Sequence, residues 1–411
     1  MKLGLIGKTL GHSWSWQIHD MLIHEHYQNW ELSEDEVIPF LEKKDFTGIN
    51  VTIPYKEKVT TVLDEISPTA EKIGAVNCII NRDGRLYGYN TDCDGFMELV
   101  KTAGMHMEGK HAAVLGSGGA AKAVMAGVSQ LGGIPVMVSR HPHDDMISYQ
   151  QMYDMQNRFS FLVNATPVGM FPHMDETPAD LDVFEHLEGV VDVVANPLRT
   201  KLCFQASCKG IPSTGGLGML VYQAAAADAL FTGQKVPQER IDACLGTLLK
   251  ERRNIVLIGM PTSGKSSVAQ MLGKQSGQQV YDMDTLLEQQ LGTSIRTCFE
   301  THGEAYFRAK ETRLARELAS KEGVIISCGG GIIKNPENMQ VLSQHGVVVW
   351  LQRNSLFPSS DRPLSADEDS LKKLYEQRRG LYEMYSDIQV ENNGTLEDTA
   401  EQILKKIGER K

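Results

Sequence analysis

Two glycine-rich loops, each set between a strand-like apolar run and a helix-like run, limit the folds open to this chain. GSGGAA (116–121) follows HAAVL and precedes KAVMAGVSQL, while GMPTSGKSS (259–267) follows NIVLI and precedes VAQMLGKQ. Such loops suit phosphate binding, because the free amides at a helix N-terminus face the ligand. The alternation continues through PVMVSR, VIISCGGG and GVVVWLQ, which predicts α/β folds with parallel sheets.

Length and charge narrow the possible functions. A chain of 411 residues exceeds the size at which one core keeps growing, so two or three domains are expected. The hydrophobic content of 41% and the charged content of 23% are ordinary for a soluble globular protein. A net charge of -11 offers no basic surface for nucleic acid, so anionic ligands must be held by local amides and single arginines.

The N-terminus and the cysteines indicate where such a chain functions. MKLGLIG enters a strand pattern directly, without the apolar segment of a signal peptide, and no run of about 18 apolar residues occurs. We therefore expect no membrane partner and a cytoplasmic location. The seven cysteines form no CxxC pair, which favours reduced thiols over a zinc site.

The first loop has the spacing of a dinucleotide site. Gly116, Gly118 and Ala121 satisfy G-x-G-x-x-A, although a plain strand-turn-helix also fits the pattern. The next strand ends in Ser139 and Arg140, where an NAD site usually has an acidic residue. A hydroxyl and a guanidinium suit a 2′-phosphate and so indicate NADP(H), unless Arg140 is only a solvated surface charge.

Six further motifs resemble the shikimate dehydrogenases over about residues 1 to 247. They occur in that family's order as GLIGKTLGHSWSWQIH, GINVTIPYK, GAVNCI, GYNTDCDG, NATPVGM and GGLGMLVYQA. The resemblance implies NADPH-dependent reduction of 3-dehydroshikimate. It also implies an N-terminal α/β substrate domain, residues 1–100 and 216–248, around a Rossmann-like NADP domain, residues 101–215.

The resemblance assigns roles to individual residues. Lys56 would be the proton donor in reduction and Asp92 would orient it, because ketone reduction needs a proton for the oxygen and a positioned Lys-Asp pair can supply and hold it. Taken alone, Lys56 would be interpreted as a solvated surface charge. The implied substrate-binding residues are Ser13, Ser15, Asn50, Thr52, Asn77, Asp92 and Gln223. The implied cofactor-binding residues are Gly116, Ser117, Gly118, Gly119, Ala120, Ser139, Arg140 and Gly216.

The second loop fits G-x-x-x-x-G-K-[ST], the nucleotide phosphate loop. Lys265 would reach the β- and γ-phosphates and the Ser266 hydroxyl would bind Mg²⁺. The residues expected to bind ATP are Thr262, Ser263, Gly264, Lys265, Ser266 and Ser267. This pattern identifies a nucleotide but not the group that accepts its phosphate.

The acceptor is indicated by a second resemblance, to the shikimate kinases, over about residues 253 to 411. It rests on YDMDTLLE, THGEAYFRAKE, SCGGG, DRPLS and RRGLY, and it implies MgATP-dependent phosphorylation of the shikimate 3-hydroxyl. Asp282 and Asp284 would form a pair at the end of a strand, with both side chains facing the same way. Asp282 would hold Mg²⁺ through water, and Asp284 would accept or orient the attacking hydroxyl. The other implied residues are Arg308 and Arg378 for the substrate carboxylate, the Gly330 amide, and Arg362 for the transferred phosphoryl group.

The chain departs from both families at several positions. Trp16 and Gly380 stand where relatives often have proline, Ala195 where they often have tyrosine, and Thr262 where they often have glycine. The segment between WLQR and DRPLS is also short. Two alternatives therefore stay open: a sensor that binds without turnover, and a quinate dehydrogenase joined to a kinase for another polyol. We predict the main junction at LKERRN, 249–254.

Overall fold

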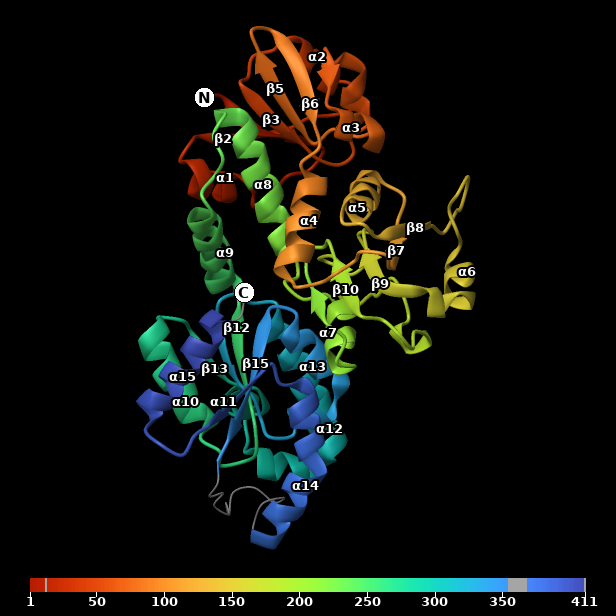
Figure 1. The fold of residues 1–411 in the computed structure, drawn as a ribbon. Helices are drawn as coiled ribbons and strands as arrows, with labels where there is room; N and C mark the ends of the chain where they lie inside the picture. The colour runs from red at the N-terminus through yellow and green to blue at the C-terminus, as the bar shows by residue number, and fades with distance from the viewer. Residues whose placement is uncertain (12, 354–367, 410–411) are drawn as a thin grey trace. The chain divides into compact units, whose positions relative to one another are not determined.

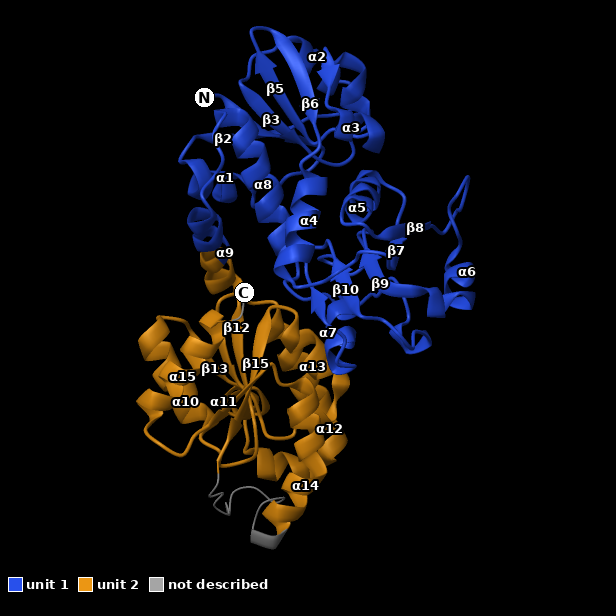
Figure 2. Ribbon diagram, in the orientation of Figure 1, with its two compact units in different colours: residues 1–245 blue, residues 246–411 orange. Residues whose placement is uncertain are grey.

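The computed structural model describes residues 1–11, 13–353 and 368–409, and it divides into two compact units (Figures 1 and 2). Unit 1 comprises residues 1–245 and unit 2 comprises residues 246–411. The boundary falls inside one helix, α9 (Gln238–Arg252), and the next strand, β12, begins at Asn254. Arg362 lies outside the described residues. No described helix combines the length and apolar character needed to cross a membrane.

The first part of unit 1 is a six-stranded mixed sheet in the order β2-β1-β3-β5-β6-β4. Its strands are β1 (Leu3–Gly7), β2 (Tyr27–Glu31), β3 (Gly48–Val51), β4 (Glu65–Ile66), β5 (Cys78–Arg82) and β6 (Arg85–Tyr89). The first three run parallel, whereas β5 and β6 form an antiparallel hairpin. Asp83 and Gly84 both have positive φ in its turn, as an Asp-Gly hairpin loop requires.

Helices cover both faces of this mixed sheet. Ile49 of β3 and Ile79 of β5 pack with Leu41 of α2 (Val37–Glu42) on one face. Cys78 and Ile80 pack on the other face with Phe231 of α8 (Leu217–Thr232). The remaining helices here are α1 (Ser15–Ile23), η1 (Lys58–Val62) and α3 (Pro68–Ile73).

The second part of unit 1 is a fully parallel sheet in the order β11-β10-β9-β7-β8. Its strands are β7 (His111–Leu115), β8 (Ile134–Val138), β9 (Phe159–Asn164), β10 (Gly189–Asp192) and β11 (Ser213–Thr214). Successive residues of a strand point to opposite faces, so Val114 packs with α4 (Asp92–Thr102) and α5 (Gly119–Gln130). Leu115 packs on the other face with α6 (Tyr149–Asp154) and α7 (Lys201–Cys208).

Unit 2 is a second parallel sheet, in the order β13-β14-β12-β15-β16. Its strands are β12 (Asn254–Ile258), β13 (Val280–Asp282), β14 (Ile325–Ser327), β15 (Gly346–Gln352) and β16 (Ile388–Glu391). Val349 of β15 packs with α10 (Lys265–Ser276) and α15 (Leu396–Glu409). The neighbouring Trp350 points to the opposite face and stacks on Tyr382 of α14 (Glu368–Tyr385) at 5.6 Å between ring centroids.

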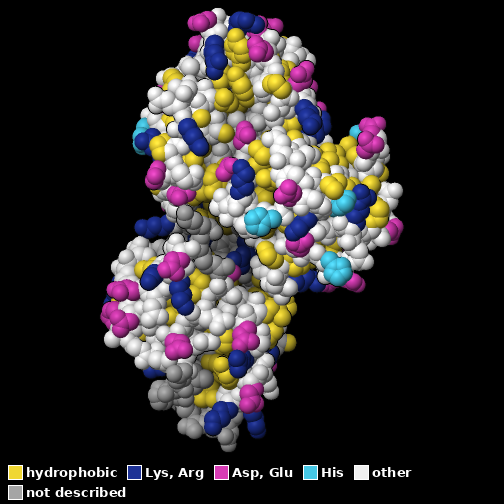
Figure 3. Space-filling model, in the orientation of Figure 1, with side chains coloured by type: hydrophobic (Ala, Val, Ile, Leu, Met, Phe, Trp, Pro, Cys, Tyr) yellow, Lys and Arg dark blue, Asp and Glu magenta, His cyan; other side chains and the backbone are white. Residues whose placement is uncertain are grey.

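The other helices described in unit 2 are α11 (Met283–Leu291), α12 (Ile295–Ala319), the 3-10 helix η4 (Ile332–Lys334) and α13 (Pro336–Ser343). Gly303, at φ 79° and ψ 167°, divides α12 into two helical pieces. The alternation predicted from the sequence is therefore confirmed in both units. On the face drawn in Figure 3, lysines and arginines among the described residues are scattered between acidic side chains instead of forming one basic patch.

Candidate active sites

The predicted dehydrogenase residues converge on one edge of the mixed sheet. This edge carries the C-terminal ends of β1, β3 and β6 and the N-terminal end of β5, because β5 runs antiparallel to its neighbours. Ser13 and Ser15 follow β1, with hydroxyl oxygens 3.0 Å apart. Asn50 lies in β3, one residue before the strand ends, Thr52 lies just beyond the strand, and Asn77 precedes β5.

Lys56 and Asp92 form an ion pair at this edge. Lys56 Nζ donates to Asp92 Oδ2 at 2.6 Å, and the two side chains are 15% and 10% exposed. Asp92 is the first residue of α4, while Lys56 lies in the loop after β3. Since both groups are largely withdrawn from water, the carboxylate fixes the ammonium in one position.

A hydrogen-bonded cluster holds the start of α4 in place. The Thr91 backbone NH donates to Asn77 Oδ1 at 2.7 Å, and Asn77 Nδ2 donates to Thr91 Oγ1 at 3.0 Å. Gln223 of α8 joins the cluster, with its Oε1 3.4 Å from Thr91 Oγ1. Two predicted substrate-binding residues thus meet through Thr91. Sequence reasoning missed Thr91, although it directly precedes Asp92 in GYNTDCDG.

A row of buried polar side chains in contact with one another supports Asn50. The Tyr27 hydroxyl donates to Asn50 Oδ1 at 2.8 Å, and the Tyr27 ring stacks on His19 at 4.1 Å between centroids. His19 Nδ1 lies 2.6 Å from Asp228 Oδ1, and both side chains are buried. Burial and the nearby Asp228 raise the pKa of Tyr27, which keeps its hydroxyl protonated as a donor. Tyr27 therefore fixes the orientation of the Asn50 amide.

We predict that Tyr27→Phe raises KM for the substrate of this site by about tenfold, because a buried Asn50 oxygen loses its donor at a cost of about 1 to 3 kcal/mol. The turnover number should change little, since Lys56 and Asp92 are untouched. Steady-state kinetics of the reaction at this site measures both constants. Tyr55→Phe is the matched control, because the Tyr55 hydroxyl donates to the Leu32 carbonyl instead. An equal rise of KM in both variants would mean a general loss of packing.

The loop after β7 has the geometry of a dinucleotide site. Gly116 has φ 112°, and a Cβ there would lie 3.0 Å from the Ala165 carbonyl oxygen, so a side chain is strained in this turn. Gly118 caps α5 in open space. A Cβ built on Gly119 would lie 3.6 Å from Lys56 Cδ. The N-terminus of α5, at Gly119, therefore lies beside the Lys56 side chain, and Ser117 and Ala120 are its near neighbours in sequence.

The end of β8 presents the residues predicted to read the cofactor phosphate. Ser139 is buried, and its Oγ accepts the His141 backbone NH at 3.1 Å. Arg140 is exposed and forms no hydrogen bond or ion pair with another described residue. The Arg140 guanidinium is thus available to an anionic ligand.

Gly216, the other residue predicted to bind the cofactor, lies against Val193. A Cβ on Gly216 would overlap the Val193 carbonyl group, so only glycine fits at this position.

The loop after β12 has the geometry expected of a phosphate-binding loop. Lys265 is buried and donates to the Gly259 and Met260 carbonyl oxygens at 3.1 and 2.8 Å. Ser263 Oγ is buried without a hydrogen-bond partner among the described residues, as expected for a group that awaits a ligand. Gly264, at φ 91°, leaves no room for a Cβ beside the Asn392 amide. These features fit a bound phosphate.

Asn392 ties this loop to the end of β16. Its Nδ2 donates to the Ser263 carbonyl oxygen at 2.9 Å, and its Oδ1 accepts from Thr399 at 3.0 Å. Thr262, the residue that replaces a common glycine, takes a left-handed φ of 64° and donates to the Pro261 carbonyl oxygen at 2.6 Å. A non-glycine residue at such a φ costs about 1 to 2 kcal/mol. Sequence reasoning missed Asn392, because no motif links it to the loop.

Ser266 and Asp282 lie together, as a shared metal site requires. Ser266 Oγ donates to Asp282 Oδ2 at 2.6 Å. Burial alone would raise the pKa of Asp282, but hydrogen bonds from Ser266, Thr285 and Ser327 outweigh it and lower the pKa. Among the described residues no group of three or more His, Cys, Asp or Glu side chains is placed to hold a metal. One carboxylate and one hydroxyl fit Mg²⁺, which takes its other ligands from phosphate and water.

The predicted strand-end pair of Asp282 and Asp284 is wrong in its geometry. Asp282 ends β13 and caps α11, its Oδ1 accepting the Thr285 NH at 3.1 Å. Asp284 therefore lies in the first turn of α11, where strand alternation does not apply. A Cβ on Gly329 would lie 2.6 Å from Asp284 Oδ1, so this carboxylate contacts the loop after β14.

The same loop, Gly329 to Gly331, gathers the predicted arginines. A Cβ on Gly331 would lie 2.5 Å from Arg308 Nη2. Arg378 is buried, and its Nη1 donates to the Gly330 carbonyl oxygen at 2.9 Å. Asp284, Arg308 and Arg378 thus surround one glycine loop. Arg362, predicted to join them, cannot be placed because it lies outside the described residues.

An ion pair with Glu311 fixes the position of the Arg308 guanidinium. Glu311 Oε2 accepts from Arg308 Nη1 at 2.7 Å, and Glu311 is 1% exposed. Burial raises the pKa of Glu311, although Arg308 acts in the opposite direction. The exposed Glu304 binds the same guanidinium at 3.2 Å and also pairs with Lys334 at 2.9 Å. Sequence reasoning missed the role of Glu311, whose signal was its position three residues after Arg308 on one helix.

Three family models match the chain. The shikimate dehydrogenase substrate binding domain matches residues 5–79, the shikimate 5'-dehydrogenase C-terminal domain matches residues 216–243, and shikimate kinase matches residues 261–408. The matched segments contain Lys56, Gln223 and the phosphate loop of unit 2 from residue 261 onward.

Relatives of known sequence or structure cover the first unit. NADP(+) shikimate dehydrogenase of Clostridium perfringens is 37% identical over 256 residues, which is 57% of this chain and 94% of that protein. The structure of the Thermus thermophilus shikimate 5-dehydrogenase with NADP(H) and shikimate is 30% identical, with a TM-score of 0.55, covering 60% of this chain and 98% of that one.

A quinate dehydrogenase from Corynebacterium glutamicum, solved with NAD, is also similar. It is 25% identical with a TM-score of 0.53, covering 60% of this chain and 98% of that one. The sequence identity to the NADP(+) shikimate dehydrogenase is higher than the identity to the quinate dehydrogenase. The shikimate kinase match follows the dehydrogenase matches along the chain. The chain belongs to the shikimate dehydrogenase family over its first unit and carries a shikimate kinase domain in its second.

Proposed function

We propose that this chain catalyses two consecutive reactions, the NADPH-dependent reduction of 3-dehydroshikimate to shikimate and the MgATP-dependent phosphorylation of the shikimate 3-hydroxyl. One observation carries the proposal: each phosphate-binding loop lies beside side chains with the acid-base or carboxylate-binding chemistry that its reaction needs. The Lys56–Asp92 pair lies next to the α5 N-terminus. Asp284, Arg308 and Arg378 surround one loop of the unit that carries Lys265.

In the first reaction Lys56 donates a proton to the substrate carbonyl oxygen. NADPH, when bound, supplies the hydride to the carbonyl carbon, so the ketone becomes a secondary alcohol. Asp92 holds the ammonium in place through their ion pair. Asn77 and Gln223, fixed through Thr91, bind substrate hydroxyls. Ser13 and Ser15, whose hydroxyls are neighbours, bind the substrate carboxylate.

Arg140 selects NADPH over NADH. Its guanidinium is exposed and unpaired among the described residues, and no carboxylate ends β8 to repel a 2′-phosphate. We predict that Arg140→Ala raises KM for NADPH by about 10- to 100-fold, the worth of a charge-assisted hydrogen bond. KM for NADH should stay nearly constant.

Initial rates with both cofactors measure this preference, and Arg158→Ala, which removes another exposed arginine of the same unit, is the control. Equal weakening of both cofactors by Arg140→Ala would show that Arg140 does not recognise the 2′-phosphate.

In the second reaction Asp284 orients the attacking hydroxyl or accepts its proton. Arg308 and Arg378 bind the substrate carboxylate, where a guanidinium offers two parallel donors. Glu311 keeps Arg308 in position, and the exposed Glu304 gives way to the substrate. Lys265 turns from its carbonyl partners to the ATP phosphates. Ser266 and Asp282 would hold Mg²⁺, which when bound would neutralise phosphate charge, and Arg362 stabilises the transferred group.

Quinate is a second candidate substrate for the first unit. Ala195 replaces the tyrosine that often lies near the substrate in relatives, and one similar structure is a quinate dehydrogenase. A panel with 3-dehydroshikimate, shikimate, quinate and gluconate separates the alternatives. Oxidation of quinate at a higher kcat/KM than that of shikimate would favour the second candidate.

The coupled assay on the intact chain tests the whole proposal. With 3-dehydroshikimate, NADPH and MgATP present, NADPH oxidation should be followed by ADP release, and omission of NADPH should abolish both. Shikimate added directly should restore ADP release without NADPH. Binding of all ligands without product formation would instead identify a sensor.

A further inference from the structure

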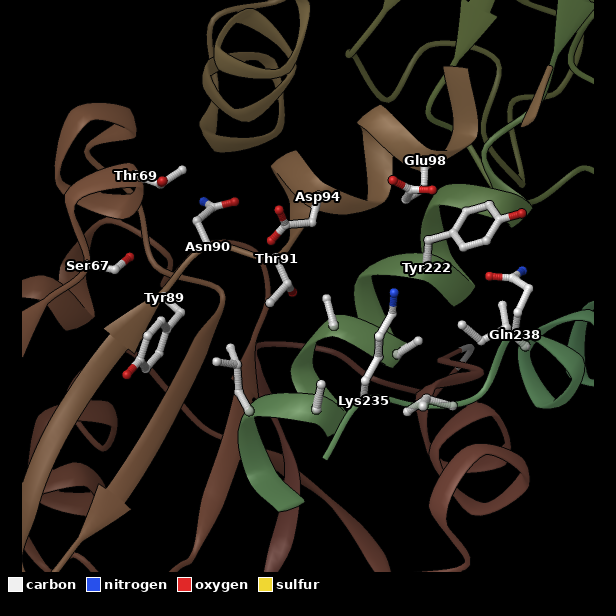
Figure 4. Close-up of a pocket in the computed structure, with 16 residues that line it drawn as sticks. Ser67, Thr69, Tyr89, Asn90, Thr91, Asp94, Glu98, Tyr222, Lys235 and Gln238 are labelled. Atoms are coloured by element: carbon white, nitrogen blue, oxygen red, sulfur yellow. The ribbon is translucent and has the colours of Figure 1, made fainter. Parts of the chain in front are cut away.

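A pocket of about 530 Å³ lies in unit 1, apart from the residues assigned above (Figure 4). We call it the α4–α8 pocket, because α4 and α8 form two of its walls. Lys56, Asp92 and the predicted substrate-binding side chains do not line it. Its volume falls within the range of small-molecule sites, and Thr91, one of its lining residues, directly precedes Asp92.

One wall of the α4–α8 pocket is apolar. It is formed by small and aliphatic side chains of α8, α9 and the segment between them: Ala225, Ala229, Leu230, Val236 and Ile241. Alanines at successive turns of α8 leave room for a ligand where larger side chains would fill the space. A hydrophobic group of the ligand would gain about 25 cal/mol for each Å² of apolar surface buried against this wall.

The opposite side of the pocket is charged. Asp94 and Glu98 of α4 line it, and Lys235 extends from the segment after α8 toward the side that they form (Figure 4). Glu98 pairs with Lys101 at 2.7 Å. The side chains of Asp94 and Lys235 form no hydrogen bond or ion pair with each other or with another described residue. The pocket thus presents one uncommitted carboxylate and one uncommitted ammonium.

The surroundings of Asp94 favour a cationic partner. Asp94 is exposed and lines the pocket, yet adjacent protein atoms partly desolvate it and raise its pKa, as does Glu98, while Lys101 acts in the opposite direction. A ligand ammonium would relieve this unfavourable environment. A ligand carrying only one sign of charge would satisfy Asp94 or Lys235 but not both.

We infer that the α4–α8 pocket binds a free α-amino acid with a large apolar side chain. Its ammonium meets Asp94, its carboxylate meets Lys235, and its side chain lies against the alanines of α8. This class combines both charges and an apolar body in one small molecule. The inference concerns a site distinct from the proposed reactions, and binding can be measured without either activity.

Isothermal titration calorimetry of the intact chain tests the inference, with L-phenylalanine, L-tyrosine and L-leucine as probes. At least one should bind in a saturable way at up to about 10 mM. L-Phenylalaninamide, which lacks the carboxylate, and 3-phenylpropionate, which lacks the ammonium, should bind at least tenfold more weakly than L-phenylalanine. L-Alanine, which lacks the large side chain, should not bind detectably.

Variants locate the bound amino acid. Asp94→Asn and Lys235→Ala should each weaken binding by about 10- to 100-fold, the worth of a charge-assisted hydrogen bond. Asp20→Asn and Lys72→Ala, which remove exposed charges outside the pocket, should leave it unchanged. Ala229→Phe, which fills the apolar side, should abolish it while the circular dichroism spectrum stays native.

Failure of all three probes to bind overturns the inference. Equal affinity of L-phenylalanine and 3-phenylpropionate also overturns it, because the ammonium would then have no partner. Binding that survives Asp94→Asn together with Lys235→Ala would place the amino acid elsewhere.

Discussion

Lys56→Ala is expected to lower the turnover number for 3-dehydroshikimate reduction by about 10²- to 10⁴-fold, the range for loss of a positioned proton donor. The ion pair of 2.6 Å with Asp92 is the reason, because removal of the ammonium takes away the proton and leaves a largely buried carboxylate without its partner. NADPH oxidation under saturating substrate measures the loss. Phosphorylation of shikimate, assayed on the same preparation, should keep its wild-type rate.

Lys58→Ala is the matched control, because Lys58 lies two residues farther on and contacts Glu34 instead. Wild-type dehydrogenase turnover in that variant, with thermal melting like that of the parent, would tie the loss to the ammonium of Lys56. A fall in kinase activity with Lys56→Ala in a folded preparation would contradict two separate active sites.

Lys265→Met is expected to reduce kinase turnover by about 10²-fold or more, since a fixed cation at the transferring phosphoryl group stabilises charge that develops in the transition state. Methionine keeps much of the buried aliphatic stem while removing the ammonium, so the loop should retain its packing. ADP release with shikimate and MgATP measures the effect. Reduction of 3-dehydroshikimate should be unaffected.

Lys274→Ala on the same helix is the control for this change, because Lys274 is exposed in the last turn of α10. If Lys265→Met left kinase turnover within about threefold of wild type, the ammonium would not act on the phosphoryl group. In that case the loop would bind nucleotide mainly through its backbone amides.

The glycine loops could be predicted from sequence because each motif records a local backbone requirement. Gly116 and Gly264 both have positive φ and both lack room for a Cβ, so glycine at these positions carries information about structure. The arginines around Gly329 to Gly331 were predicted by resemblance alone. Their convergence depends on the packing of α12 and α14 against one loop, which no local pattern encodes.

Other parts of the sites could not be predicted from local patterns. Asp284 was expected at the end of a strand. The side chain of Asp282 instead caps α11, which begins at Met283, so Asp284 is already helical. Tyr27 reaches Asn50 across 23 residues of sequence, and Asn392 reaches Ser263 across 129. The α4–α8 pocket is likewise lined by segments distant in sequence, so its charges could not be recognised as neighbours.

The continuous helix α9 has a practical consequence for anyone who would separate the two activities. Residues 238–252 are helical through the unit boundary, so a cut at 245 would leave each fragment with an unfinished helix end and several unsatisfied backbone groups. Leu248, on the far side of that cut, is fully buried. Expression of the first unit alone should therefore extend to about residue 252, and a kinase fragment that begins near 253 would lack that buried leucine. Single-domain versions need to be compared at several start and end points before an altered rate is attributed to the loss of the partner unit.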